Sequence, residues 1–281
     1  MLIRWVAPED VPRLVPLWRM AFGDSESYVY FFLERALPIG RGLLLEEEGK
    51  IASMLFLLPG SLLAQDMTAS ASYVFAVATA PSFRGRGFAA ALTRRAAETA
   101  RAEGQAALCL FPGEAGLYEY YARLGFQTAF ARQERRIFRE GGETPYLKTN
   151  LRWDPADAAA RRADRWAARG CFAWDARMLD FMRQSQTFGR GRVRCAEEGY
   201  VFYSTQGGKL LVEECCAPPE ATEWLLQKAL MTSGCEEGIA YLAAGSPICA
   251  KPGGMCLPLD DRAAQWMAKT ERLAYLGLTL E

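Results

Sequence analysis

The sequence has 281 residues, of which 51% are hydrophobic and 23% are charged, and this composition excludes a disordered or low-complexity chain. The 33 basic residues balance the 33 acidic ones, so the chain lacks the basic excess expected of a nucleic-acid-binding domain. It contains no histidine, which excludes Ser-His and Cys-His catalytic pairs and histidine metal ligands. Any catalysis must therefore rely on tyrosine, cysteine, lysine, carboxylates or backbone N–H groups.

The eight cysteines form no C-x-x-C pair, so we expect no zinc site and no bound metal. We expect them to be small buried hydrophobic residues in a reducing compartment: Cys109, Cys171, Cys195, Cys215, Cys216, Cys235, Cys249 and Cys256. The N-terminal segment reaches Glu9 too soon for a signal peptide, and the apolar run Met54–Ala64 is too short to span a membrane. The sequence therefore predicts a soluble cytoplasmic protein with no membrane partner.

Residues 1–140 are expected to form a first domain, because apolar residues alternate or recur at helical spacing throughout this range. In chain order we predict a strand at 2–7, helices at 8–22 and 25–37, strands at 42–48, 51–58 and 72–80, a helix at 88–102, a strand at 106–111, a helix at 115–124 and a strand at 126–138. Antiparallel strands followed by a strand–helix–strand crossover predict a mixed α/β (α+β) fold.

Residues 141–152 are polar and contain Gly141-Gly142 and Thr144-Pro145, so we expect a linker there. Residues 153–281 are expected to form a second domain. Its predicted elements are helices at 154–168 and 175–184, strands at 193–195, 200–204 and 209–216, a helix at 219–231, a strand at 238–243 and a helix at 260–271. The order resembles that of the first domain, which predicts a duplicated architecture.

The most informative segment runs from Val77 to Ala90, where a strand ends at Pro81 and a basic glycine loop leads into a helix. Gly85 and Gly87 allow a tight turn and a close approach of the backbone to a ligand. The free N–H groups of the loop and helix start, with Arg84 and Arg86 beside them, predict a pyrophosphate site. The alternative is a plain strand–helix turn with solvated arginines.

Two phosphate-binding patterns fit this loop. Gly85-x-Gly87-x-x-Ala90 matches a dinucleotide fingerprint, but that fold needs an acidic residue about 20 positions further on. Leu110, Phe111 and Pro112 stand there and none is acidic.

The second pattern, Arg84-x-x-Gly87-x-Ala89, resembles motif A of the GNAT superfamily of N-acyltransferases, [QR]-x-x-G-x-[GA]. The later run Tyr120-Tyr121-Ala122-Arg123-Leu124-Gly125-Phe126 resembles the F-Y-x-[KR]-x-G-F segment of that superfamily. The resemblance covers about residues 1–140, and the tandem layout looks most like bacterial acetyltransferases of the enhanced-intracellular-survival type. It implies a GNAT-like first domain followed by a degenerate GNAT-like second domain.

The resemblance also implies roles for individual residues. Acetyl-CoA would lie along Val77, Ala78 and Thr79, and backbone N–H groups near Val77 and Thr79 would polarise the thioester carbonyl. Its pyrophosphate would bind the loop residues Arg84, Gly85, Arg86, Gly87, Phe88, Ala89 and Ala90. Tyr121 would act as general acid toward the departing CoA thiolate, and an ordinary core aromatic is the alternative for this residue. The acceptor would be a small-molecule or peptide amine.

The general base stays open. Glu114 stands where the family often carries an asparagine, and this departure weakens the implied side-chain contacts to CoA. The candidates are Glu114, Glu119, Glu47, a water chain and the carboxylate of Glu281, which ends an apolar segment that is expected to be either a buried strand or a solvated tail.

The second domain lacks the glycine loop. Pro218 and Pro219 follow its corresponding strand and supply no N–H donors, and Glu220 would repel a phosphate. We therefore expect a domain that binds no CoA. The predicted activity is acetyl transfer from acetyl-CoA to a primary amine; a CoA-binding regulatory module and a dinucleotide-dependent enzyme are the alternatives. The sequence leaves open whether the chain forms a homo-oligomer.

Overall fold

The structure is a computed structural model that describes residues 1–141, 151–188, 191–245, 247–271 and 273–280. Most of the expected linker, together with Glu281, lies outside these residues.

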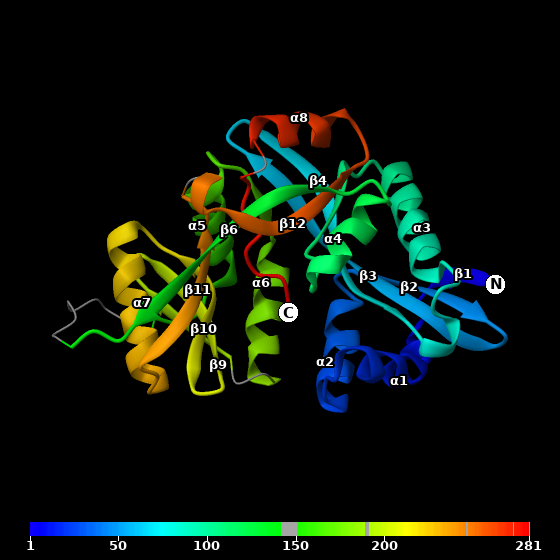
Figure 1. Ribbon diagram of the computed structural model, residues 1–281, viewed down its shortest axis with the longest axis horizontal. Helices are drawn as coiled ribbons and strands as arrows, with labels where there is room; N and C mark the ends of the chain where they lie inside the picture. Colours follow the sequence, from blue (N-terminus) through cyan, green and yellow to red (C-terminus); the bar gives the residue numbers. More distant parts are fainter. Residues whose placement is uncertain (142–150, 189–190, 246, 272, 281) are drawn as a thin grey trace. The chain divides into compact units, whose positions relative to one another are not determined.

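Helices and strands are interspersed along the described residues (Figure 1). The strands are β1 (Leu2–Trp5), β2 (Arg41–Glu47), β3 (Lys50–Ala64), β4 (Met67–Thr79), β5 (Ala107–Leu110), β6 (Gln127–Phe138), β7 (Cys171–Ala173), β8 (Arg192–Ala196), β9 (Gly199–Gln206), β10 (Lys209–Cys216), β11 (Glu237–Ala243) and β12 (Lys251–Pro258). The helices are α1 (Val11–Phe22), α2 (Glu26–Ala36), α3 (Phe88–Ala102), α4 (Ala115–Ala122), α5 (Pro155–Trp166), α6 (Ala176–Ser185), α7 (Pro219–Ser233) and α8 (Asp261–Lys269). This composition confirms the predicted mixed α/β fold.

The chain divides into two compact units that are not consecutive in sequence. Unit 1 contains residues 1–62, 69–127 and 255–265, and unit 2 contains residues 63–68, 128–254 and 266–281. The strand β6 was expected to complete the first domain, yet it belongs almost wholly to unit 2, and the end of β12 belongs to unit 1. The compact units therefore differ from the consecutive ranges 1–140 and 153–281.

The sheet of unit 1 has the strand order β1-β2-β3-β4-β5-β12. Strands β1, β2 and β3 pair antiparallel, β4 and β5 pair parallel, and β12 closes the series antiparallel to β5. The parallel pair requires the crossover helix α3, which begins directly after the glycine loop. The loop is thereby placed at the end of β4.

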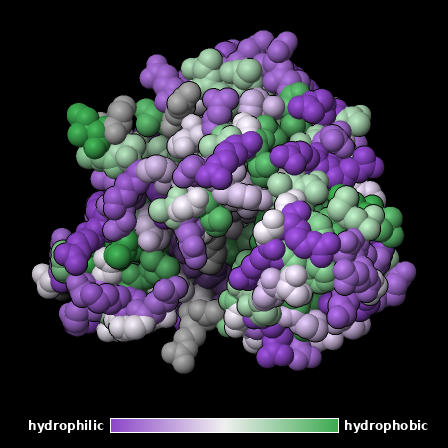
Figure 2. All heavy atoms as spheres, turned by 45° about the vertical axis from the view of Figure 1, so that its right-hand side comes forward, coloured by the Kyte–Doolittle hydropathy of each residue, from purple (hydrophilic) through white to green (hydrophobic). Residues whose placement is uncertain are grey.

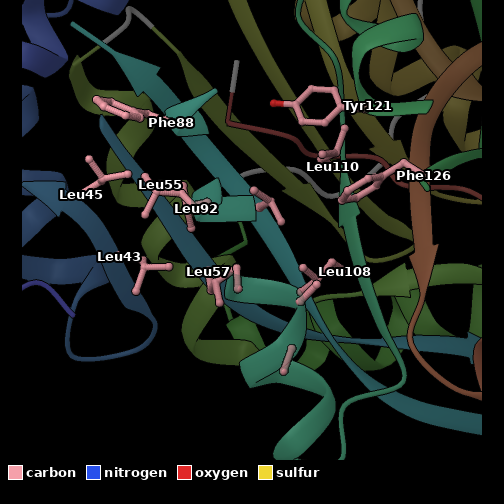
Figure 3. Packing of buried hydrophobic residues seen from close by; sticks show 14 of the residues in the cluster. Leu43, Leu45, Leu55, Leu57, Phe88, Leu92, Leu108, Leu110, Tyr121 and Phe126 are labelled. Carbon is pink, nitrogen blue, oxygen red and sulfur yellow. The ribbon is translucent and has the colours of Figure 1, made fainter. Parts of the chain in front are cut away.

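Helices cover both faces of this sheet because side chains alternate along each strand. Leu55 and Leu57 of β3 face α3, where they meet Phe88 and Leu92 in the cluster shown in Figure 3. Phe56 points the other way and packs against Trp18 of α1, with ring centroids 5.4 Å apart. The core of unit 1 therefore has two layers of apolar contacts, one on each side of the sheet.

Unit 2 repeats this plan. Its sheet runs β12-β6-β11-β10-β9-β8, and β10 pairs parallel with β11 around the crossover helix α7. Leu225 and Leu230 of α7 are fully buried in a cluster with Val201 and Val212 of the sheet. The antiparallel partner β9, the strand β10, the helix α7 and the strand β11 correspond in order to β3, β4, α3 and β5, which supports the predicted duplication.

Several sequence expectations needed correction. Strand β3 continues past Pro59-Gly60 to Ala64, although the prediction ended it at Leu58, and the prediction missed β12 altogether. Residues 274–280 form no strand, but Ala274 and Tyr275 make isolated bridges and are buried. Six of the cysteines are buried as expected, whereas Cys195 is partly exposed and Cys249 is exposed in a short turn beside Ile248.

Unit 2 contains one fully buried ion pair among the described residues, between Arg162 of α5 and Glu214 of β10, with the nitrogen and oxygen 3.2 Å apart. Arg162 also donates to the carbonyl oxygens of Phe172 and Leu276, and Glu214 accepts from the hydroxyl of Tyr200 at 2.7 Å. Both charges of this pair are therefore satisfied inside the unit, and the contact with Leu276 holds the C-terminal segment in place.

The surface is mixed in character. On the face drawn in Figure 2, hydrophilic side chains cover most of the area and hydrophobic ones are interspersed among them. None of the helices in the described ranges combines the length and the apolar composition that membrane crossing demands.

Candidate active site

The strand β4 separates from β5 before it ends. The two strands pair from Ala71 with Ala107 to Tyr73 with Cys109, after which β4 continues to Thr79 whereas β5 stops at Leu110. Ala76, with a φ of 49°, lies in this unpaired stretch, a conformation that a residue other than glycine rarely adopts. This local distortion re-aims the last residues of the strand, as bulges near active sites commonly do.

The backbone N–H and C=O groups at the end of β4 point alternately toward β3 and away from it. The amide of Ala80 donates to Ala52 of β3 at 2.9 Å, and the carbonyl of Ala78 accepts from the Ser53 hydroxyl at 2.7 Å. Because successive residues of a strand point their polar groups to opposite edges, the N–H groups of Val77 and Thr79 face away from β3. Two donors are thereby directed to the side where β5 has ended.

The glycine loop follows directly. Pro81–Phe83 form a short 3₁₀ turn, and Gly85 and Gly87 both adopt left-handed backbone conformations, with φ values of 77° and 78°. Within the described residues, the backbone N–H groups from Gly85 to Ala90 donate no backbone hydrogen bond. The first hydrogen bond of the helix runs from the Ala91 amide to the Gly87 carbonyl oxygen at 2.9 Å. A run of free donors at a helix start is the arrangement that binds phosphate.

The two arginines of the loop have different surroundings. The Nε atom of Arg84 donates to the Thr79 carbonyl at 3.2 Å, and the side chain is otherwise exposed. Arg86 instead pairs with Glu47 of β2 at 2.8 Å and lies over the ring of Phe88, 4.7 Å from its centroid. Glu47 also pairs with the N-terminal ammonium at 2.8 Å, and this ammonium first and Arg86 second lower the pKa of Glu47.

Tyr121 lies in the last turn of α4, inside the cluster that α3 and β5 form. Its ring packs against Phe126 at 5.6 Å, and Figure 3 shows its hydroxyl pointing away from that ring. Three residues after the helix ends, Gly125 turns the chain with a φ of 94°, and the Phe126 amide donates to the Tyr121 carbonyl at 3.1 Å. The Gly-Phe pair of the motif thus holds Tyr121 in place.

Burial changes the acidity of this tyrosine. Only 7% of Tyr121 is exposed, and burial, with a smaller contribution from neighbouring Tyr120, raises the pKa of its hydroxyl well above the ordinary value near 10. The hydroxyl has no hydrogen-bond partner among the described residues. Tyr121 is therefore fully protonated at neutral pH and available as a proton donor.

The candidate bases differ in their surroundings. Glu114 precedes α4, is exposed and makes no side-chain cap bond. Glu119 is exposed and paired with Arg123 at 2.5 Å, and Glu47 is engaged by Arg86. Glu281 lies outside the described residues. Glu114 is thus the one of these carboxylates in the described part of the chain that has no cation paired with it.

Some features of the site carry no sequence signal. The positive φ of Ala76 is not marked by its residue type, and the contact of Glu47 with Arg86 joins residues that are 39 positions apart. Tyr120 places its hydroxyl in a buried position without a hydrogen-bond partner in the described chain. No group of three metal-ligating side chains is found among the described residues.

The corresponding position in unit 2 is built differently. Pro218 caps α7 and Pro219 occupies its first turn, so neither residue has an N–H group to offer. Glu220 adds a negative charge in the same turn.

Comparisons with known proteins show which family part of the chain resembles. A family model described as an acetyltransferase (GNAT) domain matches residues 2–129. No curated protein matches the chain.

Solved structures share the fold over nearly the whole chain. A conserved protein of unknown function from Enterococcus faecalis, described as a probable N-acyltransferase, is 18% identical with a TM-score of 0.72, over 92% of this chain and 72% of that one. Eis1 of Mycobacterium abscessus is 18% identical with a TM-score of 0.65, over 94% and 75%. A tandem GNAT protein from the clavulanic acid biosynthesis pathway is 14% identical with a TM-score of 0.53, over 92% and 98%.

Proposed function

Because a GNAT acetyltransferase family model matches residues 2–129, we propose that this chain moves an acetyl group from acetyl-CoA to a primary amine, with Tyr121 as the general acid. The observation that carries the proposal is the end of β4, where a splayed strand, a left-handed glycine loop and a helix start present unpaired N–H groups in succession. In this proposal unit 2 has a structural role and binds no CoA.

The first step is binding of the donor. The pantetheine arm lies along Val77, Ala78 and Thr79, and the pyrophosphate binds the N–H groups from Gly85 to Ala90. The strand donors at Val77 and Thr79 polarise the thioester carbonyl, because they already point to the side that β5 has vacated. They stabilise the oxyanion as it develops.

In the second step the amine nitrogen attacks the carbonyl carbon directly, without an acyl-enzyme. The C–S bond then breaks, the amine proton leaves to a base, and Tyr121 gives its proton to the departing thiolate. A phenol and an alkyl thiol differ by roughly 1.5 pKa units, or about 2 kcal/mol, in water. The apolar surroundings that raise the pKa of Tyr121 also disfavour the thiolate, so the transfer remains accessible.

Binding of acetyl-CoA is tested by thermal unfolding. A ligand at about 100 times its Kd stabilises the folded state by roughly 2.7 kcal/mol, which for a protein of this size raises Tm by about 5 °C or more. We expect this rise with acetyl-CoA and no rise with NAD. A rise with NAD alone would favour the dinucleotide fingerprint. A rise with acetyl-CoA, without release of CoA thiol in the presence of any member of an amine library, would favour a regulatory module.

The loop is tested by Gly87→Glu. The substitution places a negative charge beside the proposed pyrophosphate position, and we expect the affinity for CoA to fall at least tenfold, or about 1.4 kcal/mol, measured by calorimetry. A Cβ at Gly87 meets no atom within 4 Å, but its φ of 78° strains any other residue. Gly87→Gln, which has the same shape and strain without the charge, is the matched control. Equal affinities for the two folded variants would contradict the phosphate contact.

The stoichiometry tests the role of unit 2. We expect calorimetry to give one CoA per chain, because the start of α7 offers two prolines and an acidic residue where α3 offers free donors. Gly87→Glu should then weaken the single binding event. A stoichiometry near two would show that unit 2 has a CoA site of its own.

A further inference from the structure

The loop that follows β4 is held at one point between its two glycines. Gly85 and Gly87 both have positive φ values, and residues of this kind lose the most conformational freedom when they are ordered. Arg86 stands between them, and its side chain is the one that reaches across to another strand. Arg86 therefore ties the stretch between the two glycines to a neighbouring strand.

Arg86 has contacts on several sides. Its guanidinium donates to Oε1 of Glu47 at 2.8 Å, lies 4.7 Å from the centroid of the Phe88 ring and 5.4 Å from that of the Phe83 ring. Glu47 itself is mostly covered, with 17% of its side chain exposed, and it stands at the end of β2. Ion pairing and cation–π contacts of this kind each contribute modestly and together restrict the side chain.

Arg84 is held much less. One bond, from Nε to the carbonyl of Thr79, aims the side chain along the end of β4, and the terminal nitrogens have no acceptor within the described residues. Those nitrogens remain free for the bidentate contact that a guanidinium makes to a phosphate.

We propose that the two arginines of the loop have different roles. Arg84 binds the phosphate of the donor. Arg86, which is held by Glu47, is a positioning residue that keeps the backbone N–H donors of the loop in place. This inference rests on the proposed function, because it assumes that the phosphates of CoA bind here. It assigns Glu47, which the sequence offered as a catalytic base, to the support of the loop.

The matched variants Arg84→Met and Arg86→Met test these two roles. Both remove one charge from the same loop, and binding of CoA is measured by calorimetry from low to moderate salt. We expect Arg84→Met to weaken binding about tenfold and to reduce its salt dependence, because a direct ionic contact is lost. Arg86→Met should weaken binding about threefold and keep the salt dependence of the wild type.

A double-mutant cycle measures the contribution of the contact between Glu47 and Arg86. We expect Glu47→Gln to weaken binding about threefold, and the combined variant Glu47→Gln/Arg86→Met to bind as the single variants do, because either change alone already releases the loop. Tighter binding by Glu47→Gln, independent losses that multiply, or a flattened salt dependence in Arg86→Met would each overturn the proposal. Absence of CoA binding by the wild type would instead contradict the proposed function.

Discussion

Replacing Tyr121 with phenylalanine is expected to lower kcat about a hundredfold or more while the affinity for CoA stays unchanged. The phenyl ring preserves the packing against Phe126 and removes only the hydroxyl, which has no partner in the described protein. The expected loss is the contribution of a positioned acid to expulsion of the thiolate. Thiol release at saturating acetyl-CoA measures kcat, and calorimetry measures the affinity.

Tyr120→Phe is the matched control, because Tyr120 is the adjacent residue, lies 5.0 Å from Tyr121 between ring centroids and also carries a buried hydroxyl. We expect this variant to keep most of its activity. Full turnover by Tyr121→Phe, or an equal loss in both variants, would reduce Tyr121 to a packing residue.

The pH dependence follows from the direction of the pKa shift. The pKa of Tyr121 is raised, so its protonated form persists to higher pH than that of an ordinary tyrosine. Loss of the acid should therefore not limit the rate below about pH 10. A fall of kcat between pH 7 and pH 9 that Tyr121→Phe abolishes would contradict this assignment.

Replacing Arg162 with methionine is expected to destabilise the protein by about 3–5 kcal/mol, because the carboxylate of Glu214 would be left buried without its partner. The carbonyl oxygens of Phe172 and Leu276 would also lose their donor. Denaturant unfolding of the full chain measures the loss.

The double variant Arg162→Met/Glu214→Leu is the control. It removes both charges, and replacement of a buried pair by apolar residues of similar volume is often neutral. We expect it to recover much of the stability, with a remaining cost because the hydroxyl of Tyr200 loses its acceptor. A single variant as stable as the wild type would mean that Glu214 reaches water.

Much of the fold and site could be predicted from local sequence. The helix α3 was predicted with its observed bounds, because Phe88, Leu92 and Ala96 recur on one face and Gly87 and Gly104 punctuate its ends. The absence of histidine alone excluded whole classes of catalyst. The glycine loop and the Tyr121 segment could be recognised because their backbone conformations depend on glycines that stand within a few residues.

Only the tertiary structure showed the features that depend on contacts between residues far apart in the sequence. The sequence did not predict that β6 pairs with β11 and that β12 pairs with β5. Strand pairing is set by long-range packing and not by the residues of one strand. Ala76 adopts a positive φ beyond the end of the β4–β5 pairing, and an alanine in a sequence gives no sign of such a conformation. The burial of Arg162 against Glu214 and the contact of Glu47 with Arg86 could not be predicted from the sequence, because each joins residues that lie far apart in the chain.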